Sequence, residues 1–272
     1  MSRTPGSARP RPAAARRHRS PGWVPNQHGA WAMLASPLLL GALAVGLHGV
    51  HALLAAFWFA GYLAFFAVSV WLKSGRRPRF RRPAATYAAA AAGLGLAMTV
   101  ARPQLVGFVP WFALPLGVGL WAAAQRRERD LLAGLTTVLG SALMTVVAYA
   151  APGATGVGGP GWGAPVGLTD GDLRRAALLA LGQFLYFGGT VWYVKSMIRE
   201  RGNVRFRRLS VLWHVASVGV VAAYSPWLAA VFAVMAARAW LVPRFSFSPK
   251  QIGIAEIFST LAVALVSLVT VR

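Results

Sequence analysis

The stretch ALLAAFWFAGYLAFFAVSVWL, residues 52–72, decides the fold of this chain. It contains no charged side chain, and about 20 apolar residues in a helix cross the ~30 Å hydrocarbon core of a bilayer. Similar uncharged runs recur along the chain and do not alternate polar with apolar residues, as barrel strands would. The sequence therefore predicts an all-α polytopic membrane helix bundle of about nine transmembrane helices, at residues 30–47, 52–72, 84–101, 104–124, 131–150, 174–194, 210–225, 227–243 and 252–270.

Basic residues predict the orientation of this bundle. The formal net charge is +22, and most lysines and arginines precede the first run or follow every second run. Cytoplasmic loops concentrate Lys and Arg, so we expect the N-terminus inside and the C-terminus outside a bacterial cytoplasmic membrane. A basic face of this kind attracts the anionic lipids of the inner leaflet. Membrane lipids are thus the expected partners, and the charge requires no nucleic acid.

An internal repeat organises the predicted domain. Lys73-Ser74 and Arg77 align with Lys195-Ser196 and Arg199 at an offset of 122 residues, after similar aromatic runs. This offset predicts a duplicated bundle rather than a short-period repeat. Residues 1–22 form an Arg-, Pro- and Ala-rich arm that we expect to be disordered. The transmembrane domain is 23–272, with repeat halves of roughly 23–124 and 131–243 and a last helix at 252–270.

The repeated element has the chemistry of an anion site. In each copy a lysine and an arginine four residues apart would share a helix face, where like charges repel by a few tenths of a kcal/mol. An anion between them would reverse the sign, since lysine binds phosphate as a point charge and arginine with two donors. The alternative is lysine snorkelling at a helix end. The predicted ligand-binding residues here are Lys73, Ser74, Arg77, Lys195, Ser196 and Arg199.

Other polar residues gather at the same membrane face. Further ligand-binding candidates are Asn26, Gln27, Glu200, Asn203, His214 and Lys250. Glu256 is the only carboxylate inside a predicted span, so it should face the bundle interior and pair with a cation or carry a proton. Its expected partners are Lys195, Lys250 or His214. His28, beside Gly29, and Glu256 are the candidate catalytic residues.

The sequence predicts neither a metal site nor a cofactor. It has no cysteine, which excludes disulfides, thiolate metal sites, iron–sulfur clusters and covalent haem linkage. His48 and His51 have no spacing typical of a metal site.

Three segments carry a family resemblance. Pro25–Trp31, Lys195–Asn203 with the basic stretch that follows it, and Pro249–Glu256 resemble the bacterial YwiC-like integral membrane family over most of residues 23–270. The architecture is also similar to the UbiA-type prenyltransferase superfamily, whose members hold a prenyl diphosphate through magnesium on two aspartate-rich motifs. The corresponding stretches, Trp71–Arg82 and Trp192–Arg208, contain Glu200 as their only acid. Magnesium prefers carboxylates, and these stretches lack the aspartates of that superfamily. A phosphate held here would therefore contact the lysines and arginines directly.

Two classes of function follow, and the sequence leaves open whether the protein is an enzyme. The first is binding or modification of a polyprenyl or other lipid phosphate in a cytoplasmic-face cavity. The second is a proton-coupled small-anion transporter or an accessory or structural membrane protein. A transporter should place polar groups near the bilayer midplane, whereas the polar residues of this sequence cluster at one face. That distribution favours lipid-phosphate binding.

Overall fold

The computed structural model describes residues 22–25, 28–153, 169–245 and 247–271. These residues form nine α-helices, three short 3-10 turns and no strand, which confirms the predicted all-α fold. The helices are α1 (His28–Ala44), α2 (Gly49–Lys73), α3 (Arg81–Ala101), α4 (Val109–Ala124), α5 (Leu131–Ala150), α6 (Asp170–Ile198), α7 (Val204–Ala222), α8 (Pro226–Leu241) and α9 (Pro249–Thr270). The predicted basic arm, Asn26, Gln27, the side chain of His28 and most of the 151–171 connection lie outside the described residues.

Seven of the described helical segments are long and apolar enough to cross a membrane. They correspond to α2, α3, α4, α5, α6, α8 and α9. The apolar part of α1 is shorter, and the first turns of α7 carry arginines. The protein is therefore a multi-pass membrane protein.

The helix α7 begins earlier than predicted, at Val204 rather than residue 210. Asn203 is its N-cap residue, and its side chain accepts a hydrogen bond from the backbone N–H of Phe206 at 3.1 Å. A side chain that satisfies a free N–H group of the first turn fixes the start of a helix. The basic segment after Asn203 is consequently the first part of α7 rather than a loop.

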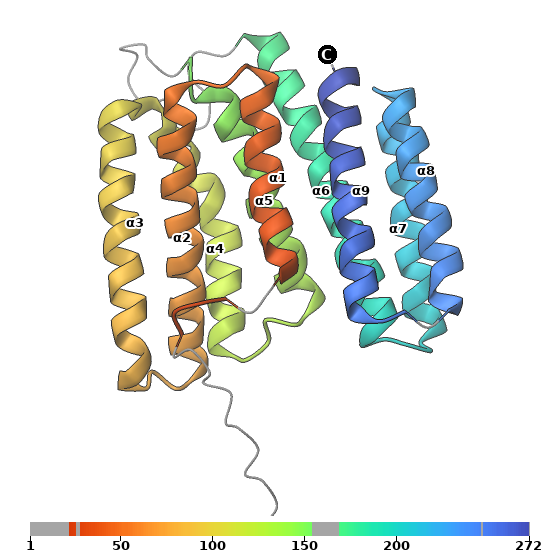
Figure 1. The fold of residues 1–272 in the computed structure, drawn as a ribbon, viewed down its shortest axis with the longest axis horizontal. Helices are drawn as coiled ribbons and strands as arrows, with labels where there is room; N and C mark the ends of the chain where they lie inside the picture. The colour runs from red at the N-terminus through yellow and green to blue at the C-terminus, as the bar shows by residue number, and fades with distance from the viewer. Residues whose placement is uncertain (1–21, 26–27, 154–168, 246, 272) are drawn as a thin grey trace, which may run out of the picture.

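The helices lie side by side, and their connections gather at two ends of the bundle (Figure 1). We call the end that carries the α2–α3, α4–α5, α6–α7 and α8–α9 connections the basic end, because the repeated lysines lie there. The helix α5 lies in the middle, with 61% of its span buried, whereas the span of α3 is 11% buried and lies at the edge. Helices α2 to α4 and α7 to α9 flank the centre on opposite sides (Figure 1).

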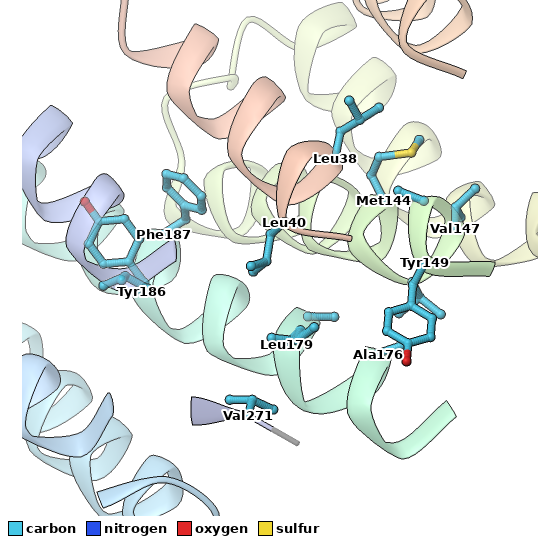
Figure 2. Close-up of a cluster of buried hydrophobic side chains, with 14 of the residues drawn as sticks. Leu38, Leu40, Met144, Val147, Tyr149, Ala176, Leu179, Tyr186, Phe187 and Val271 are labelled. Atoms are coloured by element: carbon cyan, nitrogen blue, oxygen red, sulfur yellow. The ribbon is translucent and has the colours of Figure 1, made fainter. Parts of the chain in front are cut away.

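Helices α1, α5 and α6 supply the centre of the core. Figure 2 shows Leu40 of α1, Val147 of α5 and Leu179 of α6 among its buried side chains. In contrast, large apolar side chains such as Leu96 and Val100 of α3 are exposed. Exposed apolar surface is what a helix presents to lipid.

Helices α2 to α4 and helices α6 to α8 form two series of similar lengths. Helices α2, α3 and α4 contain 25, 21 and 16 residues, and α6, α7 and α8 contain 29, 19 and 16. Lys73 ends α2 and Lys195 lies in the last turn of α6, both at the basic end. The division into repeat halves stays a prediction.

Close approach of α1 to α5 depends on Gly41. A Cβ atom at this position would overlap the carbonyl oxygen of Thr145 and lie 2.9 Å from the Cβ of Ala148. The Ser141 hydroxyl of α5 also donates to the carbonyl of Met33 on α1. Small residues let helix backbones approach closely in membranes, where packing drives association.

We expect Gly41→Ala to destabilise the protein because the α1–α5 contact cannot admit a methyl group. Overpacking costs about 1–3 kcal/mol, which corresponds to a melting temperature lower by roughly 2–10 °C for a chain of this size. Thermal unfolding of the detergent-purified protein measures the change. Gly61→Ala in α2 is the matched control, since nothing lies within 4 Å of the added Cβ. Equal melting temperatures for the two variants would contradict the packing described here.

Candidate functional site

A cavity of about 290 Å³ opens at the basic end, between the α2–α3 turn and the α4–α5 loop. We call it the cationic cavity, because four of the seven residues that line it are basic. They are Val70, Lys73, Ser74, Arg77, Arg79, Phe80 and Arg126. Three of them, Lys73, Ser74 and Arg77, are predicted ligand-binding residues.

The backbone turn after α2 brings these cations together. The Ser74 hydroxyl donates to the carbonyl of Trp71 at 2.7 Å and accepts from the backbone N–H of Arg77 at 3.2 Å. Gly75 and Arg76 then adopt left-handed φ angles of 75° and 61°. The chain reverses and enters the 3-10 turn Pro78–Phe80, whose proline fixes the first φ angle. Arg77 and Arg79 therefore come to line the same cavity as Lys73.

Two elements far apart in sequence meet at this cavity. Arg126 of the α4–α5 loop has a left-handed φ of 57°, and its Nε donates to the carbonyl of Lys73 at 3.2 Å. The Lys73 ammonium lies 2.8 Å from a carboxylate oxygen of Glu128 on the same loop. Its side chain is 49% exposed, so this ion pair leaves lysine donors open to the surroundings. The cavity walls carry four cations, and Glu128 neutralises one of them.

The second copy of the repeat makes different contacts. The Lys195 ammonium donates to the carbonyl of Arg129 at 2.8 Å, and the buried Ser196 hydroxyl donates to the carbonyl of Tyr193 at 2.7 Å. Arg199 is the C-cap residue of α6. None of the three lines the cationic cavity. The sequence left open whether the two Lys-Ser elements share one cavity, and the second element does not line the cationic cavity. The two lysines instead hold neighbouring residues of one α4–α5 loop.

Four other predicted ligand residues lie elsewhere at the basic end or inside the bundle. Asn203 caps α7 and donates from its side-chain amide to the Glu200 carboxylate at 2.9 Å. These two residues therefore hold the α6–α7 turn. Lys250 is exposed in the first turn of α9. His214 is buried, and one of its ring nitrogens lies 2.7 Å from the carbonyl of Ser210.

Glu256 lies inside the bundle and pairs with Arg238 of α8. A guanidinium nitrogen of Arg238 is 2.6 Å from a Glu256 carboxylate oxygen, and the two side chains are 13% and 14% exposed. Lys195, Lys250 and His214 were the expected partners, and this expectation is wrong. Arg238 lies about one turn before the end of α8, at the level where α9 presents Glu256. The signal that could have found it is a single arginine and a single glutamate inside successive predicted spans.

The helix α6 supplies hydroxyl groups to the other side of Glu256. Thr190 donates to its second carboxylate oxygen at 2.8 Å, and the Tyr186 hydroxyl lies 3.2 Å from the same atom. Tyr186 also contacts the Thr260 hydroxyl at 3.0 Å. We call Glu256, Arg238, Tyr186, Thr190 and Thr260 the Glu256 cluster. It joins α6, α8 and α9 through a buried charge pair.

Arg238 itself has partners on two helices. A guanidinium nitrogen donates to the Ser259 hydroxyl at 3.0 Å, and the guanidinium carbon lies 4.3 Å from the centre of the Tyr193 ring. Such cation–π contacts stabilise a desolvated guanidinium. Arg238 is consequently fixed beside Glu256 by residues of both α6 and α9.

Some polar residues lie deeper in the bundle than the basic end. Gln183 is fully buried near the middle of α6, and its side-chain oxygen accepts a hydrogen bond from the Ser36 hydroxyl of α1 at 3.0 Å. Ser36 and Thr260 are the polar residues in an apolar groove of about 320 Å³ between α1 and α9.

Sequence comparisons identify the family of this chain. The family model described as YwiC-like protein matches residues 24–149. The protein named Uncharacterized protein YwiC from Bacillus subtilis (strain 168) is 30% identical over 236 residues, which cover 86% of this chain and 92% of the relative. The chain belongs to the YwiC-like family. A Haemophilus influenzae relative is 26% identical over the same shares of both chains, and its name, Uncharacterized protein, also states no activity.

No solved structure matches the chain. The comparisons do not extend the resemblance to the UbiA-type superfamily, which stays a prediction. Relatives from two bacteria therefore align with most of this chain.

The buried charge pair predicts a non-additive response to mutation. Removing one partner leaves an uncompensated buried charge, so Arg238→Met or Glu256→Met should each lower the free energy of unfolding by about 3–5 kcal/mol. The double variant Arg238→Met/Glu256→Met should be more stable than the sum of the two losses implies. Unfolding in mixed detergent micelles measures all four proteins. Strictly additive losses would contradict the pairing.

Proposed function

We propose that this protein binds the phosphate group of an anionic lipid, such as a polyprenyl phosphate, in the cationic cavity. The observation that carries the proposal is the convergence of Lys73, Arg77, Arg79 and Arg126 on one cavity with Glu128 as their nearby carboxylate. Four cations against one acid favour an anionic occupant. An arginine guanidinium binds phosphate oxygens through two N–H donors, and a lysine ammonium adds a compact positive charge.

The position of the cavity supports a lipid rather than a free anion. It lies where α2 ends and α3 begins, at the level where lipid headgroups meet the ends of spanning helices. Val70 and Phe80 contribute apolar walls, and α3 exposes apolar side chains along its length. A lipid could therefore place its phosphate among the cations while its chain remains in the hydrocarbon. The basic end would face the cytoplasm of a bacterium, whose inner leaflet is rich in anionic lipids.

The composition of the cavity favours binding that does not depend on magnesium. Magnesium is usually held by one or two carboxylates together with phosphate oxygens. Every charged residue that lines the cavity is a cation, and Glu128 is already paired with Lys73. The guanidinium and ammonium groups themselves would neutralise the phosphate.

Thermal stability tests this function directly. Geranylgeranyl phosphate should raise the melting temperature of the detergent-purified protein, because a ligand that binds the native state stabilises it. Geranylgeraniol, which lacks the anion, and inorganic phosphate, which lacks the chain, should each give a smaller shift. Magnesium should not enlarge the shift.

Matched variants locate the site. Arg77→Gln/Arg79→Gln removes two of the lining cations and should abolish most of the shift. Arg82→Gln, which removes a nearby arginine that does not line the cavity, should retain it. Equal shifts in the two variants, or equal shifts with geranylgeranyl phosphate and geranylgeraniol, would contradict a phosphate site in the cationic cavity.

A further inference from the structure

The interface between α6 and α9 carries a line of polar side chains across the bundle, which we call the α6–α9 seam. On α6 they recur every three or four residues, and on α9 they lie on one face. Such spacing places side chains one above the other on a helix. The residues of the seam are Gln183, Tyr186 and Thr190 of α6 and Glu256, Thr260, Ser267 and Thr270 of α9.

Hydrogen bonds connect the seam at both of its ends. At the basic end it begins with the Glu256 cluster, where Thr190 and Tyr186 contact the carboxylate. At the opposite end the hydroxyls of Ser225 and Thr270 lie 2.7 Å apart. The fourteen residues from Glu256 to Thr270 rise about 21 Å along a helix. This length is about two thirds of the ~30 Å hydrocarbon core.

Between its middle and the opposite end, the seam borders polar atoms that have no hydrogen-bond partner among the described residues. They are the side-chain nitrogen of Gln183 and the hydroxyls of Tyr224 and Ser267, all buried. Gln183 and Ser267 are fully buried residues. A buried polar group without a partner costs about 1–3 kcal/mol, and such groups in proteins are normally satisfied by ordered water. Gln183 and Ser267 belong to the seam, and Tyr224 of the α7–α8 turn lies beside it, so these atoms indicate two water positions, one at Gln183 and one shared by Tyr224 and Ser267.

Gly182 gives two of these groups a common space. A Cβ atom built on Gly182 would lie 3.5 Å from the Tyr224 hydroxyl and 3.9 Å from the Ser267 hydroxyl. The absence of a side chain there leaves both hydroxyls close to the same position, which a Leu228 methyl group also borders at 3.6 Å. A water molecule needs two to four polar partners, and these hydroxyls supply two of them.

We propose that the α6–α9 seam holds a file of water molecules that conducts protons between the opposite end and Glu256. A proton would pass along water and hydroxyl groups from Thr270 past Ser267 and Gln183 to Thr260. It would bind a carboxylate oxygen of Glu256, and the same proton would leave to water at the basic end. One proton enters and one leaves, so the step needs no other reactant.

Protonation of Glu256 would leave Arg238 of α8 as an unpaired positive charge, which opposes the step. At rest the ion pair has no net charge, and Ser259 and the Tyr193 ring are the remaining contacts of the guanidinium when the carboxylate is neutral. The other neighbours are Tyr186 and Thr190 of α6, with His214 of α7 beside them against Gly189. Intramembrane carboxylates in such surroundings are typical of proton relays. The inference does not depend on lipid-phosphate binding.

Proton flux into proteoliposomes tests the proposal. The full chain is reconstituted with a pH-sensitive dye inside, and a potassium gradient with valinomycin sets the membrane potential in either direction. We expect wild-type flux well above that of protein-free vesicles. Glu256→Gln removes the proton acceptor, and Gln183→Leu makes the middle of the seam apolar, so each should lower the flux at least tenfold. Thr99→Val, on the exposed face of α3, is the control and should keep wild-type flux.

A second measurement on the wild-type protein removes any dependence on variant folding. X-ray radiolysis generates hydroxyl radicals from water inside a protein and labels side chains next to it. Tyr186 and Phe232 are 3% and 2% exposed, so radicals from surface water have equally little access to both side chains. We expect Tyr186 to be labelled several times faster. Equal labelling, wild-type flux equal to that of protein-free vesicles, or full flux in Glu256→Gln or Gln183→Leu would each overturn the proposal.

Discussion

Hydrocarbon offers no hydrogen bonds, so a charged side chain inside a bilayer needs a partner from the protein itself. The Glu256–Arg238 pair meets this requirement and determines how α6, α8 and α9 lie together. Arg238 is fixed by Ser259 and the Tyr193 ring, and Glu256 by Thr190 and Tyr186. Each of these contacts joins two different helices. The pair is thus a site where charge specifies the packing of α6, α8 and α9.

The α4–α5 loop plays the corresponding role at the basic end. Lys73 and Lys195, the matched lysines of the internal repeat, contact Glu128 and the carbonyl of Arg129. Helices α2 and α6 therefore both contact the α4–α5 loop. Arg126 of that loop lines the cationic cavity. Because the first lysine keeps half of its side chain exposed, the same residue can hold the loop and still attract an anion. Structural and binding roles need not exclude each other here.

Much of the fold could be predicted from the sequence, because a spanning helix is recorded in its length and apolar composition. The run at residues 52–72 becomes α2, and the other predicted spans each correspond to a helix. Glu256 was identifiable for the same reason, as an acid inside an apolar run. Its partner was not, since the meeting of Arg238 with Glu256 depends on how α8 and α9 pack. Sequence spacing fixes which residues share a helix face, but not which face of another helix they meet.

In the candidate site, too, contacts within one segment could be predicted and contacts between distant segments could not. The local cluster Lys73, Ser74 and Arg77 was predictable because one tight turn brings these residues together. Arg126 was not, because it arrives from a loop more than forty residues away, and the second lysine contacts that loop instead of the cavity. Glu200 and Asn203 were predicted as ligands, whereas their contacts hold the start of α7. A polar residue just before a helix is often a capping residue, and that signal was present in the sequence.

Native mass spectrometry of the protein extracted in mild detergent would test whether the cationic cavity holds the phosphate of a lipid, by measuring which membrane lipids remain bound. We expect retained anionic phospholipid or polyprenyl phosphate on the wild-type protein and on Arg82→Gln, and its loss from Arg77→Gln/Arg79→Gln. The same bound lipids on all three proteins, or none on the wild type, would contradict it.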